Sequence, residues 1–115
     1  MSQISVEELY ELYIDTSKRC LSSTCDQTDE NMGYDLFEEF DSDVMAFYSD
    51  DALERLCKAG KISNEAAVAS QRIRQFWIDL DPYSFRLDEI RSHPKWKQLF
   101  SMCDELQGLI KQNSK

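Results

Sequence analysis

The segment DQTDENMGYDLFEEFDSDVMAFYSDD, residues 26–51, holds ten carboxylates and no lysine or arginine. Its apolar side chains recur at intervals of three and four residues, which places them on one face of an α-helix. The spacing therefore predicts a helix over residues 34–48, with the carboxylates on the opposite face. The apolar positions of this helix are Leu36, Phe37, Phe40, Val44, Phe47 and Tyr48.

The sequence before this helix predicts another helix and then a loop. Ser5 and Glu8 form the S-x-x-E pattern of a capping box, and the apolar period that follows predicts a helix over residues 6–21. Residues 22–33 are polar, which indicates a loop. A short strand or an irregular ordered loop over residues 22–35 is equally compatible with the sequence.

The sequence after residue 48 predicts two more helices. Ser49 is expected to cap a short helix, which Gly60 ends because glycine tolerates the left-handed backbone conformation of a helix C-terminus. Ser63 is expected to cap a longer helix. That helix must stop before Pro82, since the residue preceding a proline disfavours the helical conformation.

A short helix and a long one complete the pattern. Residues 87–91 are compatible with a single helical turn, after which Ser92 is expected to cap a last helix that Pro94 opens. This last helix has an apolar face formed by Trp96, Leu99, Phe100, Cys103, Leu106 and Ile110.

Composition agrees with a helical fold. The chain has 115 residues, of which 42% are hydrophobic, with only three glycines and two prolines to form turns. Such a composition argues against a fold of many short strands. We therefore predict an all-α, single-domain antiparallel bundle of five or six helices. Its acidic helices and loop are expected over residues 20–54 and a helical scaffold over residues 55–115.

The N-terminus and the cysteines indicate where the protein resides. The sequence MSQISVEELYELY lacks a basic region followed by an apolar run, and no stretch approaches eighteen apolar residues. We expect a soluble, cytoplasmic protein that does not contact membranes. The four cysteines are then expected to remain free thiols.

The charges are distributed unevenly along the chain. The net charge is −2 over residues 1–19, −11 over residues 20–54 and +4 over residues 55–115. The acidic segment repels nucleic acid and anionic membranes, and it attracts a basic surface. The arginines and lysines near the C-terminus are expected to pair with the acidic helices or to keep the surface soluble.

No residue pattern identifies a catalytic or metal site. His93 is the one histidine, and its position before Pro94 favours a capping or exposed role. Cys20 and Cys25 are the likeliest zinc pair by spacing, but the other two cysteines are distant in sequence. An EF-hand loop is excluded because its fifth position would be Met32. We predict neither a cofactor nor a catalytic residue.

The acidic segment instead suggests a protein interface. Like charges at helical spacing destabilise an isolated helix, which favours a basic partner that compensates this cost. Aromatic residues interleaved with charges are typical of tight interfaces. The alternative is a solvated face that only keeps the protein soluble. The predicted contact residues are Asp35, Glu38, Glu39, Asp41 and Asp43, then Asp50 and Asp51, with Tyr34 and Tyr48 as aromatic anchors.

Two stretches resemble a known family. LERLCKAGKISNEAAVASQRIRQFW, residues 53–77, carries an L-x-x-L-x-x-x-G-K-I-S pattern, and RLDEIRSHPKWKQLFSMCDELQGLI, residues 86–110, carries I-x-x-x-x-x-W-x-x-L. Together they resemble the small α-helical immunity proteins of bacterial polymorphic toxin and contact-dependent growth inhibition systems. The resemblance implies a cytoplasmic bacterial protein that neutralises one cognate toxin domain, often a nuclease with a basic cleft. It also implies that the C-terminal helices are scaffold and that the acidic surface contacts the toxin.

Two other functions remain compatible with the sequence. A nucleic-acid mimic would use the same carboxylates to inhibit or regulate a protein that binds DNA or RNA, and it would tolerate several related partners. A small carboxylate enzyme would instead have a pocket with inward acids of perturbed pKa. For the immunity protein we expect a monomer, although the sequence leaves the oligomeric state open.

Overall fold

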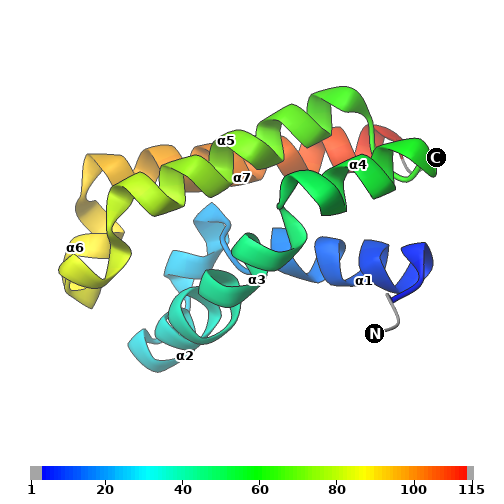
Figure 1. Ribbon diagram of the computed structural model, residues 1–115. Coiled ribbons are helices and arrows are strands. Elements are labelled where there is room, and N and C mark those ends of the chain that lie inside the picture. Colours follow the sequence, from blue (N-terminus) through cyan, green and yellow to red (C-terminus); the bar gives the residue numbers. More distant parts are fainter. Residues whose placement is uncertain (1–3, 114–115) are drawn as a thin grey trace.

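Helices α5 and α7 lie side by side and antiparallel, and they form the upper layer in Figure 1. Helix α1 and the helical run from α2 to α3 form a second layer beneath them, and α4 connects the two layers (Figure 1). The computed structural model describes residues 4–113. The elements are α1 (Val6–Ser17), η1 (Ser22–Asp26), α2 (Asp29–Gly33), η2 (Tyr34–Phe40), α3 (Asp41–Phe47), α4 (Asp50–Lys58), α5 (Asn64–Leu80), η3 (Pro82–Ser84), α6 (Leu87–Ser92) and α7 (Pro94–Asn113).

The predicted fold class is confirmed. The described residues contain no strand, and they form six α-helical segments when the continuous run α2, η2 and α3 is counted as one. A single cluster of buried side chains draws on every one of these segments. In that cluster the Trp77 ring lies 5.0 Å from Phe40 and 5.7 Å from Trp96, measured between ring centroids. Both layers of the molecule therefore share one core.

The helix ends follow the predicted capping residues around α4 and α5. The Ser49 hydroxyl accepts a hydrogen bond from the Ala52 N–H at 3.3 Å, and the Ser63 hydroxyl accepts one from the Ala66 N–H at 3.1 Å. Gly60 adopts a positive φ of 74° two residues after the end of α4, next to the capping residue Ala59. This conformation is costly for other residues, which explains why a glycine ends this helix.

The first helix is shorter than predicted. It ends at Ser17 instead of residue 21. The hydroxyls of Thr16 and Ser17 are buried and donate hydrogen bonds to the carbonyls of Leu12 and Ile14, at 2.8 and 2.6 Å. Side chains that bond to their own backbone in this way compete with regular helix geometry, which is consistent with an early end to the helix.

The predicted loop at residues 22–33 is wrong in its second half. Residues 22–26 form the 3₁₀-helix η1, and α2 already begins at Asp29. The Thr28 hydroxyl caps α2 by accepting a hydrogen bond from the Asn31 N–H at 3.2 Å. Met32, in the same short helix, is fully buried. The helix thus starts early because a threonine cap and one deeply buried methionine outweigh the polar character of the segment.

The predicted cap of the last helix also needs correction. Ser92 belongs to α6, and its hydroxyl donates to the Asp88 carbonyl at 3.4 Å. His93 caps α7 instead, because its Nδ1 atom accepts a hydrogen bond from the Lys95 N–H at 3.1 Å. The alternative of a capping histidine, favoured by the sequence, is confirmed.

Candidate functional site

The acidic segment folds into one continuous helix, residues 29–47, which we call the acidic helix. Its central part, η2, is a π-helix, whose wider turns join each N–H to the carbonyl five residues earlier. The Asp41 N–H, for example, bonds to the Leu36 carbonyl. The π-helical turn brings side chains five residues apart onto the same face, and it therefore sets which carboxylates lie next to which aromatic rings.

The buried side chains explain why the helix widens here. Met32, Leu36, Phe40, Val44 and Tyr48 are all buried, and each lies four residues after the previous one. In a regular α-helix of 3.6 residues per turn, every such step would rotate the side chain by about 40° away from the core. The wider turn of η2 offsets this drift. All five residues can then contact the same core.

Asp41 is a predicted contact residue that the structure uses internally. Its carboxylate accepts hydrogen bonds from the Trp77 indole N–H and from the Tyr83 hydroxyl, both at 2.8 Å. Trp77 is almost fully buried, so this bond satisfies a polar group in the core. Asp41 therefore ties the acidic helix to α5 and to the turn that follows it.

Asp35 also has partners within the chain. Its carboxylate accepts hydrogen bonds from the Arg19 guanidinium at 2.9 Å and from the Gln27 amide at 2.8 Å. Arg91 likewise pairs with Asp29, and its guanidinium donates hydrogen bonds to the carbonyls of Cys25 and Gln27, which precede α2. The expectation that cations of the C-terminal half pair with the acidic helices is thus confirmed for Arg91.

Two tyrosines stand exposed beside these carboxylates. Tyr34 is 51% exposed and Tyr83 is 64% exposed. The Tyr34 hydroxyl donates to the Glu39 carboxylate at 2.5 Å, a contact between residues five apart along η2. Tyr83 donates to Asp41. These hydrogen bonds are the main reason why the pKa of both phenols is raised, so both tyrosines stay protonated and neutral.

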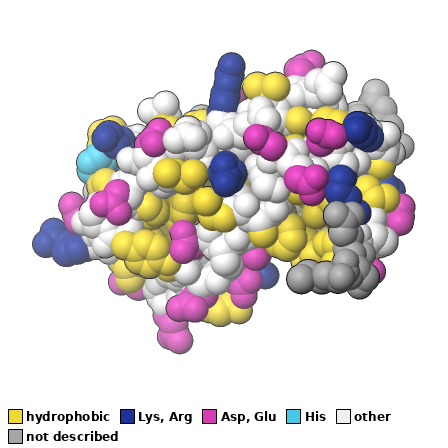
Figure 2. Space-filling view, viewed as in Figure 1, with side chains coloured by type: hydrophobic (Ala, Val, Ile, Leu, Met, Phe, Trp, Pro, Cys, Tyr) yellow, Lys and Arg dark blue, Asp and Glu magenta, His cyan; other side chains and the backbone are white. Residues whose placement is uncertain are grey.

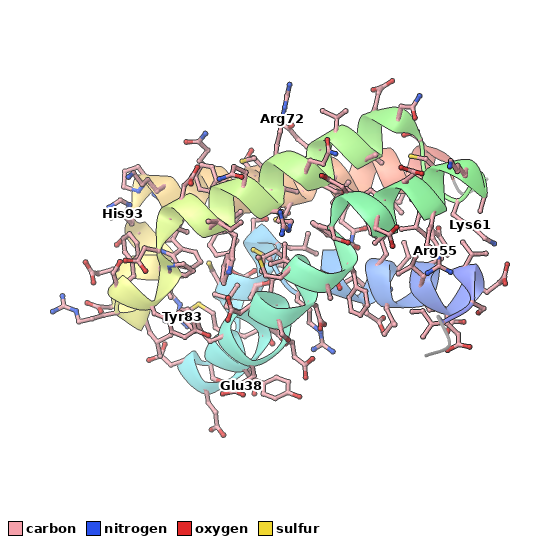
Figure 3. The ribbon with its side chains drawn as sticks, in the orientation of Figure 1. Glu38, Arg55, Lys61, Arg72, Tyr83 and His93 are labelled. Carbon is pink, nitrogen blue, oxygen red and sulfur yellow. The ribbon has the colours of Figure 1, made fainter. Side chains whose placement is uncertain are left out.

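The negative charge of Glu38 acts on both Tyr34 and Tyr83. The residue is exposed, and its charge contributes to the raised pKa of both Tyr34 and Tyr83. Figure 3 shows Glu38 and Tyr83 on the same lower side of the molecule. We call this set, Tyr34, Glu38, Glu39, Asp41 and Tyr83, the acid–tyrosine surface. Its two aromatic rings are oriented by carboxylates and remain available to a partner.

The other predicted acids occupy different positions. Asp43 is partly buried on α3, and its pKa is raised, mainly by burial and then by the nearby charge of Glu39. Asp50 and Asp51 are exposed in the first turn of α4. Asp50 accepts a hydrogen bond from the Gln71 amide at 3.2 Å. These two residues follow the break at Ser49 and so belong to a separate helix.

The prediction of Tyr48 as an aromatic anchor is wrong. The side chain is 1% exposed, and its ring centroid lies 5.2 Å from that of Tyr13 inside the core. Burial raises the pKa of its phenol well above the ordinary value. The spacing of four residues from Val44 directs it inward with the other buried side chains. Tyr48 is a core residue.

Tyr83 is a surface residue that the sequence did not single out. It lies in η3, within a DPYS turn that gives no sign of contact with a helix more than forty residues earlier. Its ring centroid lies 5.1 Å from that of Phe37, and its hydroxyl reaches Asp41. Only the folded chain brings the turn against the acidic helix.

Acidic side chains occur over much of the face shown in Figure 2, and lysine and arginine side chains lie among them in its upper part. In Figure 2, acidic side chains gather at the lower edge, where α2 and η2 lie, next to apolar side chains.

Among residues 4–113, no group of three histidine, cysteine, aspartate or glutamate side chains is arranged to hold a metal ion. No helix in the same range is long and apolar enough to span a membrane. All four cysteines are free.

Comparison of the chain with protein-family models, curated proteins and solved structures finds no match. The function is therefore argued from the acid–tyrosine surface and from the chemistry it presents.

Proposed function

We propose that this protein is an immunity protein, which binds a cognate toxin domain with a basic surface, such as a nuclease, and neutralises it. The observation that carries the proposal is the pair of exposed tyrosines, Tyr34 and Tyr83, each held by a carboxylate of the acidic helix. The resemblance of residues 53–77 and 86–110 to immunity proteins points to the same function. The expected site of the protein is the bacterial cytoplasm, where its toxin acts.

The acid–tyrosine surface has the chemistry of a tight interface with a basic protein. Tyrosine is enriched among residues that dominate binding energy, because its ring buries a large area with few rotatable bonds. Tyr34 and Tyr83 are held before binding, so a partner does not have to order them. Lysine and arginine side chains of the partner can also stack on the two rings.

The unpaired charge of the same surface favours fast association. The Glu38 side chain is exposed and has no hydrogen bond or ion pair with any residue between 4 and 113. Acidic residues of this kind attract a basic partner over long distance and raise the association rate. In a nuclease, the same basic groups hold the phosphates of the substrate. A bound acidic helix would occupy that position and prevent catalysis.

The first experiment is a pull-down from the source cell with this protein as bait, at low and at moderate salt, followed by mass spectrometry. The proposal predicts a single basic toxin domain. With that domain purified, Glu38→Gln combined with Glu39→Gln should lower the association rate. Tyr34→Ala combined with Tyr83→Ala should instead accelerate dissociation, because it removes the aromatic anchors.

A matched control is Glu11→Gln, an equal change of charge at an exposed position of α1. It should leave both rates nearly unchanged. Capture of several proteins that bind DNA or RNA would contradict the immunity function and favour a nucleic-acid mimic. A partner that is indifferent to the four substitutions would show that the acid–tyrosine surface is only a solvated face.

A further inference from the structure

A second face of the molecule, on the opposite side from the acidic helix, has a different chemistry. Helices α5 and α7 enclose a recess of about 420 Å³, with apolar Ala69 and Leu109 in its wall. A smaller recess of about 110 Å³ adjoins it and adds Met102. We call the two together the α5–α7 furrow. Arg72, on its rim, projects away from the molecule at the upper edge of Figure 3.

The residues of α5 along this furrow have the spacing that is typical of a helix face packed against another helix. Glu65, Val68, Ala69 and Arg72 follow one another at intervals of three, one and three residues, so they lie on one face. Val68 is 45% exposed, although it is apolar and β-branched. The side chains of Glu65 and Arg72 form no ion pair or hydrogen bond with another residue in the range 4–113. This face of α5 is thus apolar at its centre and carries one charge of each sign, and α7 adds the exposed Glu105 to the wall of the furrow.

The order of these residues is complementary to itself. In a two-fold symmetric pair, the same patch of both copies meets in antiparallel orientation, and each contact occurs twice. If the axis passes between Val68 and Ala69, Glu65 of one copy faces Arg72 of the other, and Val68 faces Ala69. The small Ala69 side chain permits close approach of the two helices. Within one chain, Glu65 and Arg72 are about 10 Å apart along the helix and cannot pair.

The charge balance of the two helices also permits self-association. Together α5 and α7 contain five basic and four acidic residues, whereas the segment 20–54 carries −11. Two acidic helices brought together would repel each other strongly. The furrow is lined by only three charged residues, Glu65, Arg72 and Glu105, so two furrows would repel each other far less. Figure 1 places the acidic helix in the layer opposite α5 and α7. A pair joined through the furrows keeps both acid–tyrosine surfaces exposed.

We propose that the α5–α7 furrow binds a second copy of this chain, forming a two-fold symmetric dimer centred on Val68 and Ala69. This assembly replaces the monomer expected from the sequence. It does not depend on the proposed function, since it uses other residues and another face.

The test is sedimentation equilibrium of the full chain over roughly a thousand-fold range of concentration, because a dimer dissociates on dilution. Glu65→Arg and, separately, Arg72→Glu each place like charges against each other. Each should raise the dissociation constant of the dimer at least about ten-fold. The double variant exchanges the two charges and should restore the dimer, a rescue that requires contact between the copies. Glu11→Arg on α1 is the control and should leave the dimer intact.

Two results would overturn the dimer. One is a chain that is monomeric at every concentration. If Val68→Glu then also abolished binding of the toxin domain, the furrow would be a binding site for that partner instead. The other is a dimer that tolerates both single reversals. Val68→Glu should itself fold normally, because the side chain is exposed, and circular dichroism checks this. Glu38→Gln should leave the dimer unchanged, so failure of the dimer and failure of toxin binding are distinguishable.

Discussion

The carboxylates of the acidic helix are alike in sequence but differ in what they contact. Asp41 accepts hydrogen bonds from Trp77 and Tyr83, while Glu38 points to solvent without a partner among residues 4–113. A hydrogen bond that satisfies a buried donor stabilises the fold, and an exposed charge contributes little. The acidic segment therefore contains residues of two kinds, some that hold the fold together and some that are available to a partner.

This difference predicts unequal effects of mutation. Asp41→Ala leaves the buried Trp77 indole N–H without its acceptor, and it should lower the free energy of unfolding by about 1–3 kcal/mol. Glu38→Ala, at an exposed position of the same helix, should change it by less than about 0.5 kcal/mol. Urea unfolding followed by tryptophan fluorescence measures both. Equal effects of the two substitutions would show that the Trp77 bond does not stabilise the fold.

At the level of elements, much of the helical pattern could be predicted from the sequence. The apolar period located the face of α7, while serine and glycine located the ends of α4 and the start of α5, because these signals are local. The acidic helix was predicted from residue 34, although it begins at Asp29. Its first turn is stabilised by the burial of Met32, a tertiary contact that the polar residues around it conceal.

The candidate surface was predicted only in part, for two physical reasons. The π-helical turn changes which side chains share a face, so Tyr34 meets Glu39. Tyr48 lies four residues after Val44 and turns inward with the other buried side chains. A signal was present, since five apolar residues at a strict interval of four do not fit a regular α-helix. Tyr83 joins the surface through contacts distant in sequence, which no local pattern indicates.

The π-helical turn itself gives a prediction for the acidic helix. Deletion of Glu38 converts the apolar spacing around Phe40 from four residues to three, so a regular α-helix would keep the same residues buried. The deletion should therefore change the free energy of unfolding by less than about 1 kcal/mol. Urea unfolding measures the stability, and circular dichroism shows whether the helix is retained.

The matched control for this deletion is removal of Ala46, also exposed but located in the regular helix α3. Its loss rotates Phe47 and Tyr48 by about 100° relative to the core. Unpacking a large aromatic side chain should cost about 3–5 kcal/mol. If both deletions were equally costly, the wider turn would not be an extra residue accommodated in an otherwise regular helix.

At the scale of the whole molecule, the core holds ionisable groups that must stay neutral. Burial raises the pKa of Tyr13 from 10.0 to about 12, although its hydrogen bond with Ser70 acts in the opposite direction. Burial also raises the pKa of Tyr48 and of the Cys20 thiol well above their ordinary values. These groups come from α1, the segment after it and the end of α3. Because each must be neutral to remain buried, the stability of the core depends on pH.

These shifts predict that the protein loses stability in alkali. Because the pKa values are higher in the folded state, the unfolded chain releases its protons first, and each rise in pH then favours unfolding. The contribution of Tyr13 is fully present below pH 10 and is lost as the pH rises from its ordinary pKa of 10.0 towards about 12. A shift of this size corresponds to about 3 kcal/mol for Tyr13 alone. Urea unfolding at a series of pH values measures the decline.

Tyr48→Phe isolates the cause of this decline, because it keeps the buried ring and removes one ionisable hydroxyl. The free energy of unfolding of this variant should fall less steeply above pH 10, by about 1.4 kcal/mol per pH unit for the group removed. Tyr10→Phe serves as the control, because it makes the same substitution at a half-buried position of α1. A decline equally steep in wild type and Tyr48→Phe would exclude the Tyr48 phenol as a source and leave Tyr13 and the Cys20 thiol as the buried groups that could cause it. Repulsion among the surface charges is distinguished from both, because added salt suppresses it.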